Sequence, residues 1–316
     1  MTEDQLNSLT NMATGTGNSE PVRTQSLRRE QEKEQQFEVS RVLIPTDYSN
    51  NADKALVLAA DIARHFNAEL LVIHAYHMPF TDEHMPPDMV KELLDAQKMR
   101  AEDEMKQYEK KHGSDLGDTK VQFRALMGFA SEAILDIAHH EQANLIILGT
   151  KGANSIEDRM FGTVTWNIIK KSKIPVIALP DVTEPVHFRN LMVPFEGTEQ
   201  DYDIISYLLG FAVKYNATVH AVHFMQDTNA YNKSLIDKLQ SGFRKDIEAE
   251  RLQLHFLAEK NITEGIKKFA SRNQIDMIGM VTHNHGLFST IFHMSVTRNI
   301  ALYSQIPLLA YNCDKL

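Results

Sequence analysis

The chain has 316 residues, twice the ~150 of a typical domain, so its length favours two domains. Hydrophobic residues make up 43% and charged residues 24%, which is ordinary for globular proteins and excludes a collagenous, low-complexity or mostly disordered chain. Lys and Arg number 33 against 42 Asp and Glu, and the net charge of −9 excludes the overall basic surface of a general nucleic-acid binder. Local anion-binding pockets are compatible with this balance.

Cysteine content and hydropathy favour a reducing cytoplasm as the compartment. The chain has a single cysteine, Cys313, so no disulfide can form within it. No run approaches the ~18 apolar residues of a membrane span. The first ten residues are polar and acidic, so we expect no secretory signal there.

The first segment, residues 1–38, is predicted to be a flexible polar tail. It is rich in Ser, Thr, Asn, Gln, Glu and Arg. Its few apolar groups cannot offset the entropy lost when such a segment is ordered.

From Arg41 onward, short β-branched runs alternate with longer helical patterns, which is typical of a parallel sheet covered by helices. The predicted strands are 41–46, 68–76, 120–126, 143–148 and 175–179. The predicted helices are 52–66, 88–112, 130–140 and 163–171. This alternation predicts an α/β doubly wound, Rossmann-like domain with a five-stranded parallel sheet.

The second half of the chain repeats the first. Ile44-Pro45 recurs as Val193-Pro194, and Ile73-His74 recurs as Val222-His223, both at an offset of 149. Ile174-Pro175 recurs as Ile306-Pro307, at an offset of 132. The second copy has therefore lost 149 − 132 = 17 residues, and the long second helix is the expected place. Pro, Thr and Glu between residues 180 and 188 interrupt both periodicities, which predicts domains at 39–182 and 187–316.

A spaced set of glycines follows the fourth strand. Gly149 and Gly152 lie three residues apart, and Gly162-Thr163 opens the next helix after nine further residues. Glycines let the backbone turn tightly onto an anion, and unpaired N–H groups at a helix N-terminus bind phosphate. The pattern indicates a phosphate cradle. It is neither a Walker A loop nor the close-set glycine motif of dinucleotide-binding folds.

With these motifs, the first copy resembles a universal stress protein domain of the UspA type, and the chain from about 40 to 312 resembles a tandem member of that family. The supporting residues are Ile44 to Asp47 with Ser49, Val72 to His74, the glycine set and Ile174 to Val176. The resemblance implies an adenine nucleotide alpha hydrolase-like fold and an ATP site. It implies that Pro45, Thr46 and Asp47 line the adenosine, that the backbone near Ala75 meets the adenine, and that Gly149, Gly152, Gly162, Thr163 and Val164 hold ribose and phosphates.

Several of these residues have a simpler structural interpretation. Asp47 or Ser49 can serve only as the N-cap of the following helix. Lys151 and Arg159 can neutralise phosphate or stay solvated. His74 is predicted to be a hydrogen-bonded core histidine. The methionines within 88–105 are predicted to pack in the core or at an interface.

The second copy departs from the binding pattern. Val281, Asn284 and Met294 stand where the first copy has Gly149, Gly152 and Gly162, and Phe195-Glu196 replaces Thr46-Asp47. Bulky side chains obstruct close approach to phosphate, so we expect one nucleotide per chain. The same loop holds His283, His285 and His293. A metal there is a minority hypothesis, and no metal site is predicted, because no cysteine or Glu-x-x-His spacing supports it.

The sequence favours a nucleotide-binding regulatory module in the stress response over an enzyme. The expected ligand is ATP, with ADP or AMP as alternatives and Mg²⁺ as a possible companion, and no nucleic acid or membrane is expected as partner. The alternatives are an ATP-hydrolysing or adenylyl-transferring enzyme of the same fold, or a structural protein without nucleotide. No catalytic residue set is visible near the cradle. We also expect the two copies to pack as a pseudo-twofold pair through their last strands, with a further homodimer possible.

Overall fold

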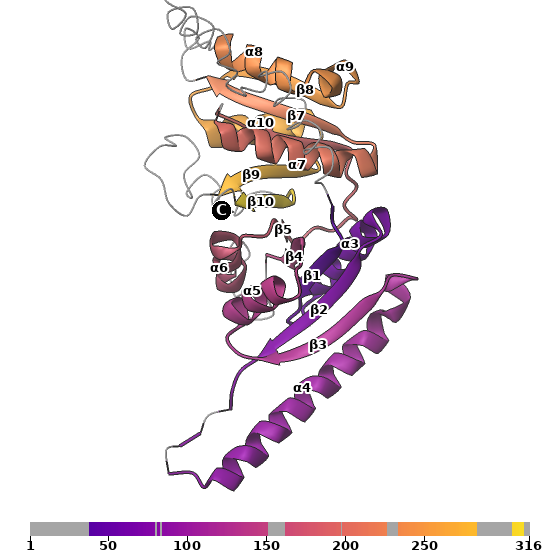
Figure 1. The fold of residues 1–316 in the computed structure, drawn as a ribbon, viewed down its shortest axis with the longest axis vertical. Coiled ribbons are helices and arrows are strands. Elements are labelled where there is room, and N and C mark those ends of the chain that lie inside the picture. Colours follow the sequence, from indigo (N-terminus) through magenta and orange to yellow (C-terminus); the bar gives the residue numbers. More distant parts are fainter. Residues whose placement is uncertain are drawn as a thin grey trace, which may run out of the picture. The chain divides into compact units, whose positions relative to one another are not determined.

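The computed structural model describes residues 38–79, 81–82, 84–150, 162–196, 198–225, 233–282 and 305–312. The expected tail therefore lies outside the described residues, apart from Glu38. The first half has the predicted alternation of strands and helices (Figure 1): β1 (Arg41–Pro45), α3 (Asn50–Phe66), β2 (Glu69–Tyr76), α4 (Pro87–Leu116), β3 (Val121–Met127), α5 (Ala130–His140), β4 (Leu145–Gly149), α6 (Thr163–Lys171) and β5 (Val176–Leu179).

The second half follows the same order where it is described: β6 (Asn190–Pro194), α7 (Glu199–Tyr215), β7 (Thr218–Met225), α8 (Lys233–Gly242), α9 (Arg244–Glu248), β8 (Leu252–Ala258), α10 (Ile262–Arg272), β9 (Met277–Thr282) and β10 (Leu308–Asn312). The 30-residue α4 is matched here by α8 and α9, of 10 and 5 residues. The expectation that the second copy is shortened at its long helix is therefore confirmed.

The described strands form one ten-stranded sheet in the order β3-β2-β1-β4-β5-β10-β9-β6-β7-β8. Within each half the strands pair in parallel, as predicted. The last strands of the two halves, β5 and β10, pair antiparallel and join the halves. In the first half the strand order reverses between β1 and β4, and ligands of such sheets bind at the carboxyl ends of the strands at this point.

Alternation along the strands divides the first core between two layers of helices. Leu43, Leu71, Ile73, Ile146 and Leu148 are buried in one cluster with α5 and α6. The helices α3 and α4 contact the sheet and each other. The cluster beneath α5 and α6 also includes Ala310 of β10, so the second half contributes to the core of the first.

A second contact between the halves lies at the ends of α3 and α7. The Tyr215 hydroxyl donates a hydrogen bond to Oδ2 of Asp61 at 3.0 Å. The ring of His65 stacks on Tyr215 with centroids 4.1 Å apart, and the Phe66 and Phe211 rings lie 5.3 Å apart. Both helices end in an asparagine with positive φ, Asn67 in the first half and Asn216 in the second.

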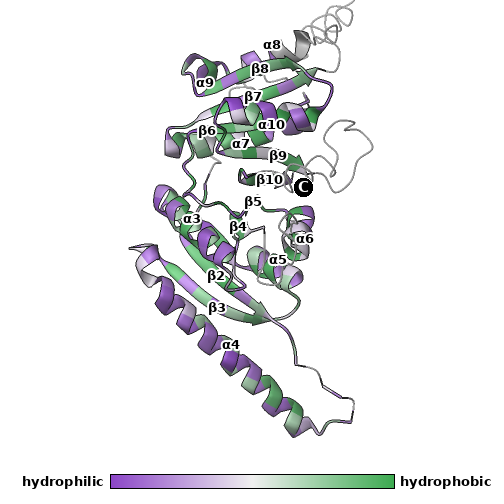
Figure 2. Cartoon of the chain, turned by 180° about the vertical axis from the view of Figure 1, so that it is seen from behind, coloured by the Kyte–Doolittle hydropathy of each residue, from purple (hydrophilic) through white to green (hydrophobic). Residues whose placement is uncertain are grey.

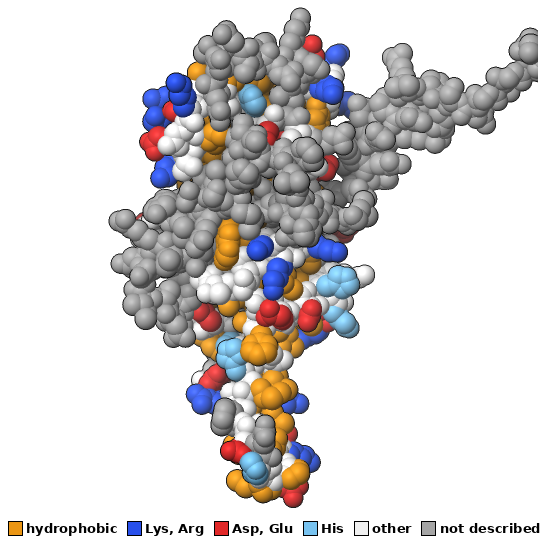
Figure 3. All heavy atoms as spheres, turned by 90° about the vertical axis from the view of Figure 1, so that its left-hand side faces the viewer, with side chains coloured by type: hydrophobic (Ala, Val, Ile, Leu, Met, Phe, Trp, Pro, Cys, Tyr) orange, Lys and Arg blue, Asp and Glu red, His pale blue; other side chains and the backbone are white. Residues whose placement is uncertain are grey.

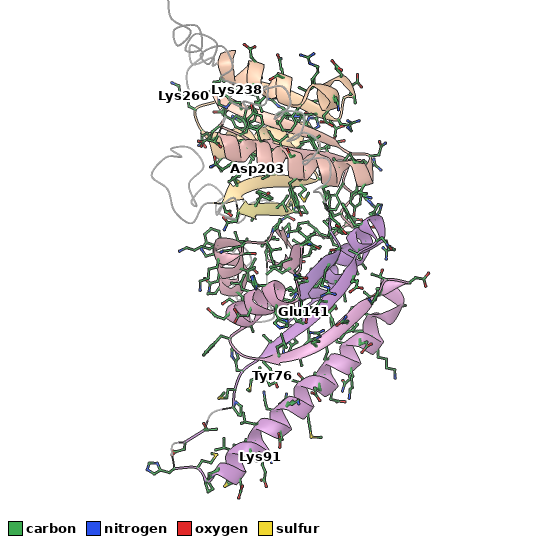
Figure 4. The ribbon with its side chains drawn as sticks, in the orientation of Figure 1. Tyr76, Lys91, Glu141, Asp203, Lys238 and Lys260 are labelled. Atoms are coloured by element: carbon green, nitrogen blue, oxygen red, sulfur yellow. The ribbon has the colours of Figure 1, made fainter. Side chains whose placement is uncertain are left out.

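The long helix α4 is buried only along its C-terminal half, through Ala101, Met105, Tyr108, His112 and Leu116. Its N-terminal half continues past β2 and β3, with Lys91 on this part (Figures 1 and 4). Hydrophobic residues gather toward this end, as Figures 2 and 3 show. Met105 lies in the core as expected. Met89 and Met99 do not, because they are 52% and 70% exposed on the part of α4 that extends beyond the sheet.

Glu141, labelled in Figure 4, joins α5 to two strands of the first half. Its carboxylate forms ion pairs with Arg41 on β1 at 2.9 Å and with Arg124 on β3 at 2.6 Å. Hydrogen bonding from Arg124 lowers the pKa of the Glu141 carboxyl below its usual range. The network fixes the amino end of β1, whereas the predicted site lies at the carboxyl end of this strand.

Candidate functional site

The turn after β1 is shaped by the side chains of its own residues. Oγ1 of Thr46 accepts the N–H of Tyr48 at 3.0 Å, and Oδ1 of Asp47 accepts the N–H of Ser49 at 3.1 Å. Ser49 is the N-cap of α3, and its hydroxyl accepts the third N–H of the helix at 3.2 Å. The capping interpretation thus holds for Ser49, whereas Asp47 supports the turn and remains exposed at the end of the sheet.

Gly149 ends β4 beside this turn. Leu43 of β1 pairs with Ile146 of β4, so continuing the register brings Thr46 level with Gly149. A Cβ on Gly149 would lie 2.7 Å from Nδ2 of Asn51 and 3.1 Å from its backbone oxygen. Glycine is therefore required here because α3 packs closely on the end of β4.

The chain leaves β4 and returns to α6 at nearly the same point. The N–H of Gly162 donates to the carbonyl of Thr150 at 2.8 Å, which closes the intervening segment at its base. The hydroxyl of Thr165, in the first turn of α6, donates to the carbonyl of Gly149 at 2.9 Å. Sequence reasoning did not single out Thr165. Gly152, Lys151 and Arg159 fall within 151–161 and lie outside the described residues.

Gly162 is the N-cap of α6, and neither its backbone nor its packing against the described residues requires a glycine. Its φ of −58° and ψ of 145° suit any residue, and the one described atom that a Cβ would meet is the Thr150 carbonyl oxygen, at 3.6 Å. Having no side chain, it cannot cap the first N–H groups of the helix, which have no partner inside the helix. Thr163 and Val164 are exposed beside them. As far as the described residues go, the start of α6 is therefore open to an anion.

The carboxyl end of β2 forms the other side of the site. Ala75 is half-buried in β2 and pairs with Leu126 of β3. Nδ1 of His74 lies 2.8 Å from the carbonyl oxygen of Thr46. The Tyr48 ring stacks on His74, with ring centroids 4.4 Å apart. The predicted hydrogen bond of His74 is confirmed, but the residue is half-buried and not part of the core.

A polar cluster beneath this turn was not predicted from the sequence. His112 of α4 is buried, with Nε2 3.2 Å from Asp53 of α3 and Nδ1 2.9 Å from Asp115. Burial raises the pKa of the Tyr108 and Tyr48 hydroxyls, which keeps both neutral at physiological pH. The cluster joins α4 to the start of α3 and supports the turn from below. A Tyr and a His four residues apart on one helix face were its only sequence signal.

The structure thus places most of the predicted binding residues around the carboxyl ends of β1, β2 and β4 and the start of α6. These residues are Pro45, Thr46, Asp47, Ala75, Gly149, Gly162, Thr163 and Val164. The amides at the start of α6 can bind an anion, and the ends of β1 and β2 can contact the rest of a ligand. The geometry offers binding groups, and among the described residues no nucleophile and base are paired beside them.

The corresponding region of the second half is filled by side chains. Phe195 follows β6, is 1% exposed, and contacts the rings of His223 and Phe256 at centroid distances of 5.3 and 6.1 Å. Nδ1 of His223 lies 2.9 Å from the Phe195 carbonyl oxygen, as in the first half. Val281 occupies the position of Gly149 near the end of β9. Asn284, His283, His285, His293 and Met294 lie outside the described residues.

The described part of the chain contains neither a metal-ligating cluster nor a membrane-spanning helix. Within these residues, no three His, Cys, Asp or Glu side chains are grouped so that they could hold a metal ion. No helix there combines the length and hydrophobicity needed to span a membrane.

Comparison with known proteins gives consistent matches. A universal stress protein of Methanocaldococcus jannaschii is 28% identical over 144 residues, which cover 44% of this chain and 81% of that protein. The stress response protein NhaX of Bacillus subtilis is 24% identical over 162 residues, which cover 45% of this chain and 98% of that protein. Each aligns with less than half of this chain.

The structural comparison extends over both halves. The crystal structure of a universal stress protein from Archaeoglobus fulgidus matches with a TM-score of 0.66 and 18% identity, over 87% of this chain and 97% of that one, and so shares the fold. The model of the universal stress protein family matches twice, at residues 38–180 and 187–312. The chain therefore belongs to the universal stress protein family, with two copies of its domain in tandem.

Proposed function

We propose that the first half, residues 39–182, binds an adenine nucleotide, and that the protein is a nucleotide-controlled regulatory module of the stress response. The observation that carries the proposal is Gly162. Among the described residues nothing requires a glycine there, and the helix that it precedes begins beside the end of β4, one of the two strands at the switch point of the sheet. A phosphate at this position would account for the absence of a side chain.

The proposed assignment follows the geometry outward from α6. The amides of Thr163 and Val164 bind phosphate oxygens, since the N–H of Gly162 already bonds to Thr150. Gly149 and Gly152 complete the cradle. Pro45, Thr46 and Asp47 contact the ribose and adenine, and the backbone near Ala75 borders the base. ATP is the expected ligand, with Mg²⁺ balancing its charge, and ADP or AMP would use the same adenosine contacts.

The second half is proposed to bind no nucleotide. Phe195 is a large buried side chain where the first half has the smaller Thr46, and Val281 carries a branched side chain where the first half has Gly149. Loss of a few charge-assisted hydrogen bonds weakens binding by several orders of magnitude. We therefore expect one nucleotide per chain.

We also propose that the halves, with their boundary between 182 and 187, form a permanent pseudo-twofold pair in place of a second subunit. The pairing of β5 and β10 supports this. Ile177 pairs with Leu309, its own equivalent at the offset of 132, and Val176 pairs with Ala310, the equivalent of Ala178. A register centred on one equivalent pair is what a twofold axis produces.

The contact of α3 with α7 supports the same symmetry. Phe66 and Tyr215 are equivalent at the offset of 149, and their ring centroids lie 6.3 Å apart.

The expected compartment is the cytoplasm, in line with the single cysteine.

The test is a titration of the nucleotide-free protein with ATP, followed by calorimetry and by the fluorescence of Trp166, the single tryptophan, about one turn into α6. Saturation at one equivalent per chain is expected. Gly162→Val should abolish binding while the protein stays folded, because its added Cβ clashes with none of the described residues but occupies the phosphate position.

Gly113→Val is the matched control, since Gly113 lies in α4 with no atom within 4 Å of an added Cβ, and it should bind ATP as the wild type does. Wild-type affinity in Gly162→Val would contradict the cradle, and two equivalent sites would contradict the assignment of the second half. Release of phosphate during the titration would favour the enzymatic alternative.

A further inference from the structure

The helix α6 is held at both ends, and its two anchors come from different halves of the chain. At its start, the Thr165 hydroxyl bonds to the carbonyl of Gly149 in β4. At its end, Nδ2 of Asn312, in β10 of the second half, donates to the carbonyl of Ser172 at 3.0 Å. Asn312 and Ser172 are each 2% exposed, so this contact is shielded from water.

Ser172 fixes the position of the C-terminal end of α6. It is the C-cap of α6, and its N–H donates to the carbonyl of Ile168 at 2.8 Å. Its hydroxyl donates to the Ile174 carbonyl at 2.6 Å and accepts the Ile174 N–H at 3.0 Å, which sets the turn into β5. The Ser172 carbonyl is used by Asn312, so all polar groups of the cap are engaged.

The buried side of α6 also shares a hydrophobic cluster with the second half. Ile168 and Ile169 are buried in the same hydrophobic cluster as Ala310 of β10. Asn312 lies two residues after Ala310 on that strand. The strand thus supplies both an apolar surface beneath α6 and a hydrogen-bond donor at its C-cap.

We infer that Asn312 is a positioning residue for the nucleotide site, through which the second half sets the position of α6. The inference rests on the proposed function, because it gives the second half a role in how tightly the first half binds its nucleotide. A nine-residue helix is about 13 Å long and moves as a rigid rod. Holding the Ser172 carbonyl therefore also fixes the amides at the opposite end of α6. By thermodynamic linkage, a ligand at those amides must in turn stabilise the contact with β10.

The test compares two variants, each of which removes a hydrogen bond between the halves. Asn312→Ala removes the donor at the end of α6. Tyr215→Phe removes the bond to Asp61, which joins α3 to α7 and leaves α6 untouched. We expect Asn312→Ala to weaken ATP binding at least about fivefold, and Tyr215→Phe to change it by less than about twofold. Equal losses in both variants would show that the interface as a whole, not α6, carries the effect, and would overturn the inference.

Amide hydrogen exchange separates this inference from the proposed function. In the nucleotide-free protein, the amides at the C-terminal end of α6, residues 168–171, should exchange faster in Asn312→Ala than in the wild type or in Tyr215→Phe. Unchanged exchange there overturns the inference, whether or not ATP binds. Failure of the wild type to bind ATP overturns the proposed function and with it the role of Asn312 toward a nucleotide, whereas the exchange decides separately whether β10 holds α6.

A measurement on the wild type covers the case in which Asn312→Ala does not fold. Saturating ATP should slow the exchange of β10 amides, residues 308–312, and leave the edge strand β8 unchanged. Slowing confined to the first half, with β10 unaffected, would overturn the coupling.

Discussion

Acidification from pH 7 to pH 5 is expected to destabilise the protein through a histidine pair in the second half. His220 on β7 is 6% exposed, and its Nδ1 lies 3.1 Å from Nε2 of His255 on β8. Its Nε2 lies 3.3 Å from Oδ1 of Asn190. The Phe269 ring covers His255, with centroids 4.9 Å apart. A proton added to this pair has little access to water.

The sign and size of the effect follow from the histidine pKa. Burial, with a further contribution from the charge of His255, lowers the pKa of His220 to about 4 from an ordinary value of 6.5. Burial lowers the pKa of His255 in the same direction. Below pH 6.5 the unfolded chain takes up a proton at position 220 that the folded protein refuses, so stability present at neutral pH is lost as the pH falls toward 4. At 1.36 kcal/mol per pKa unit, the loss between pH 7 and pH 5 is about 2 kcal/mol.

The assay is urea denaturation at half-unit steps from pH 7 to pH 5, with His220→Leu as the informative variant. The equivalent residue in the first half is Leu71, which is buried in its sheet, so leucine suits such a position. The pH dependence of the variant should be flatter than that of the wild type by about 2 kcal/mol over this range. His139→Gln, at an exposed position of α5, is the control and should leave the slope unchanged. An unchanged slope in His220→Leu would refute the reasoning.

Three further substitutions test the local structure by urea denaturation at pH 7. Gly149→Ala should destabilise by about 1–3 kcal/mol, because the new methyl overlaps Asn51, and wild-type stability would show that α3 can shift without cost. Asn144→Ala should cost about 1–3 kcal/mol, since its Oδ1 accepts backbone N–H groups at the start of β1, including that of Arg41 at 2.9 Å; a smaller loss would mean that water replaces it. Ser49→Ala should cost about 1 kcal/mol through the lost N-cap of α3, whereas Ser49→Asp should retain stability.

Local signals in the sequence predicted the elements well where they coincided with packing. The helix α6 was expected at 163–171 and has those bounds, because a glycine precedes it and Ser172 begins the turn into β5. The helix α4 was expected to end at His112, before Gly113, but it continues to Leu116. Burial of Leu116 outweighs the low helix propensity of Gly113, and Gly117, with a φ of +57°, ends the helix instead.

The contacts that give the site its shape could not be predicted, because they join residues that are distant in sequence. Asn51 bonds to a carbonyl 128 residues away, and Asn312 to one 140 residues away. His220 meets His255 across two strands whose register depends on the fold of the second half. In each case the residue type is compatible with a solvated side chain, and only the register of the strands brings the partners together.

Gly149 and Gly162 are subject to different constraints, and comparison with the second half separates them. Gly149 allows α3 to approach the end of β4. In β9 the corresponding close approach lies two residues earlier, at Gly279, where an added Cβ would be 2.6 Å from a methyl of Leu208 in α7. In the second half, α7 thus packs closely on the middle of β9, at Gly279. The end of β9 can therefore carry Val281 without displacing α7. Val281 therefore needs no distortion of the second half to be accommodated. Because Gly162 has no packing function against the described residues, its presence in the first half is the better indication of a ligand, and the loss of affinity in Gly162→Val is the more specific test.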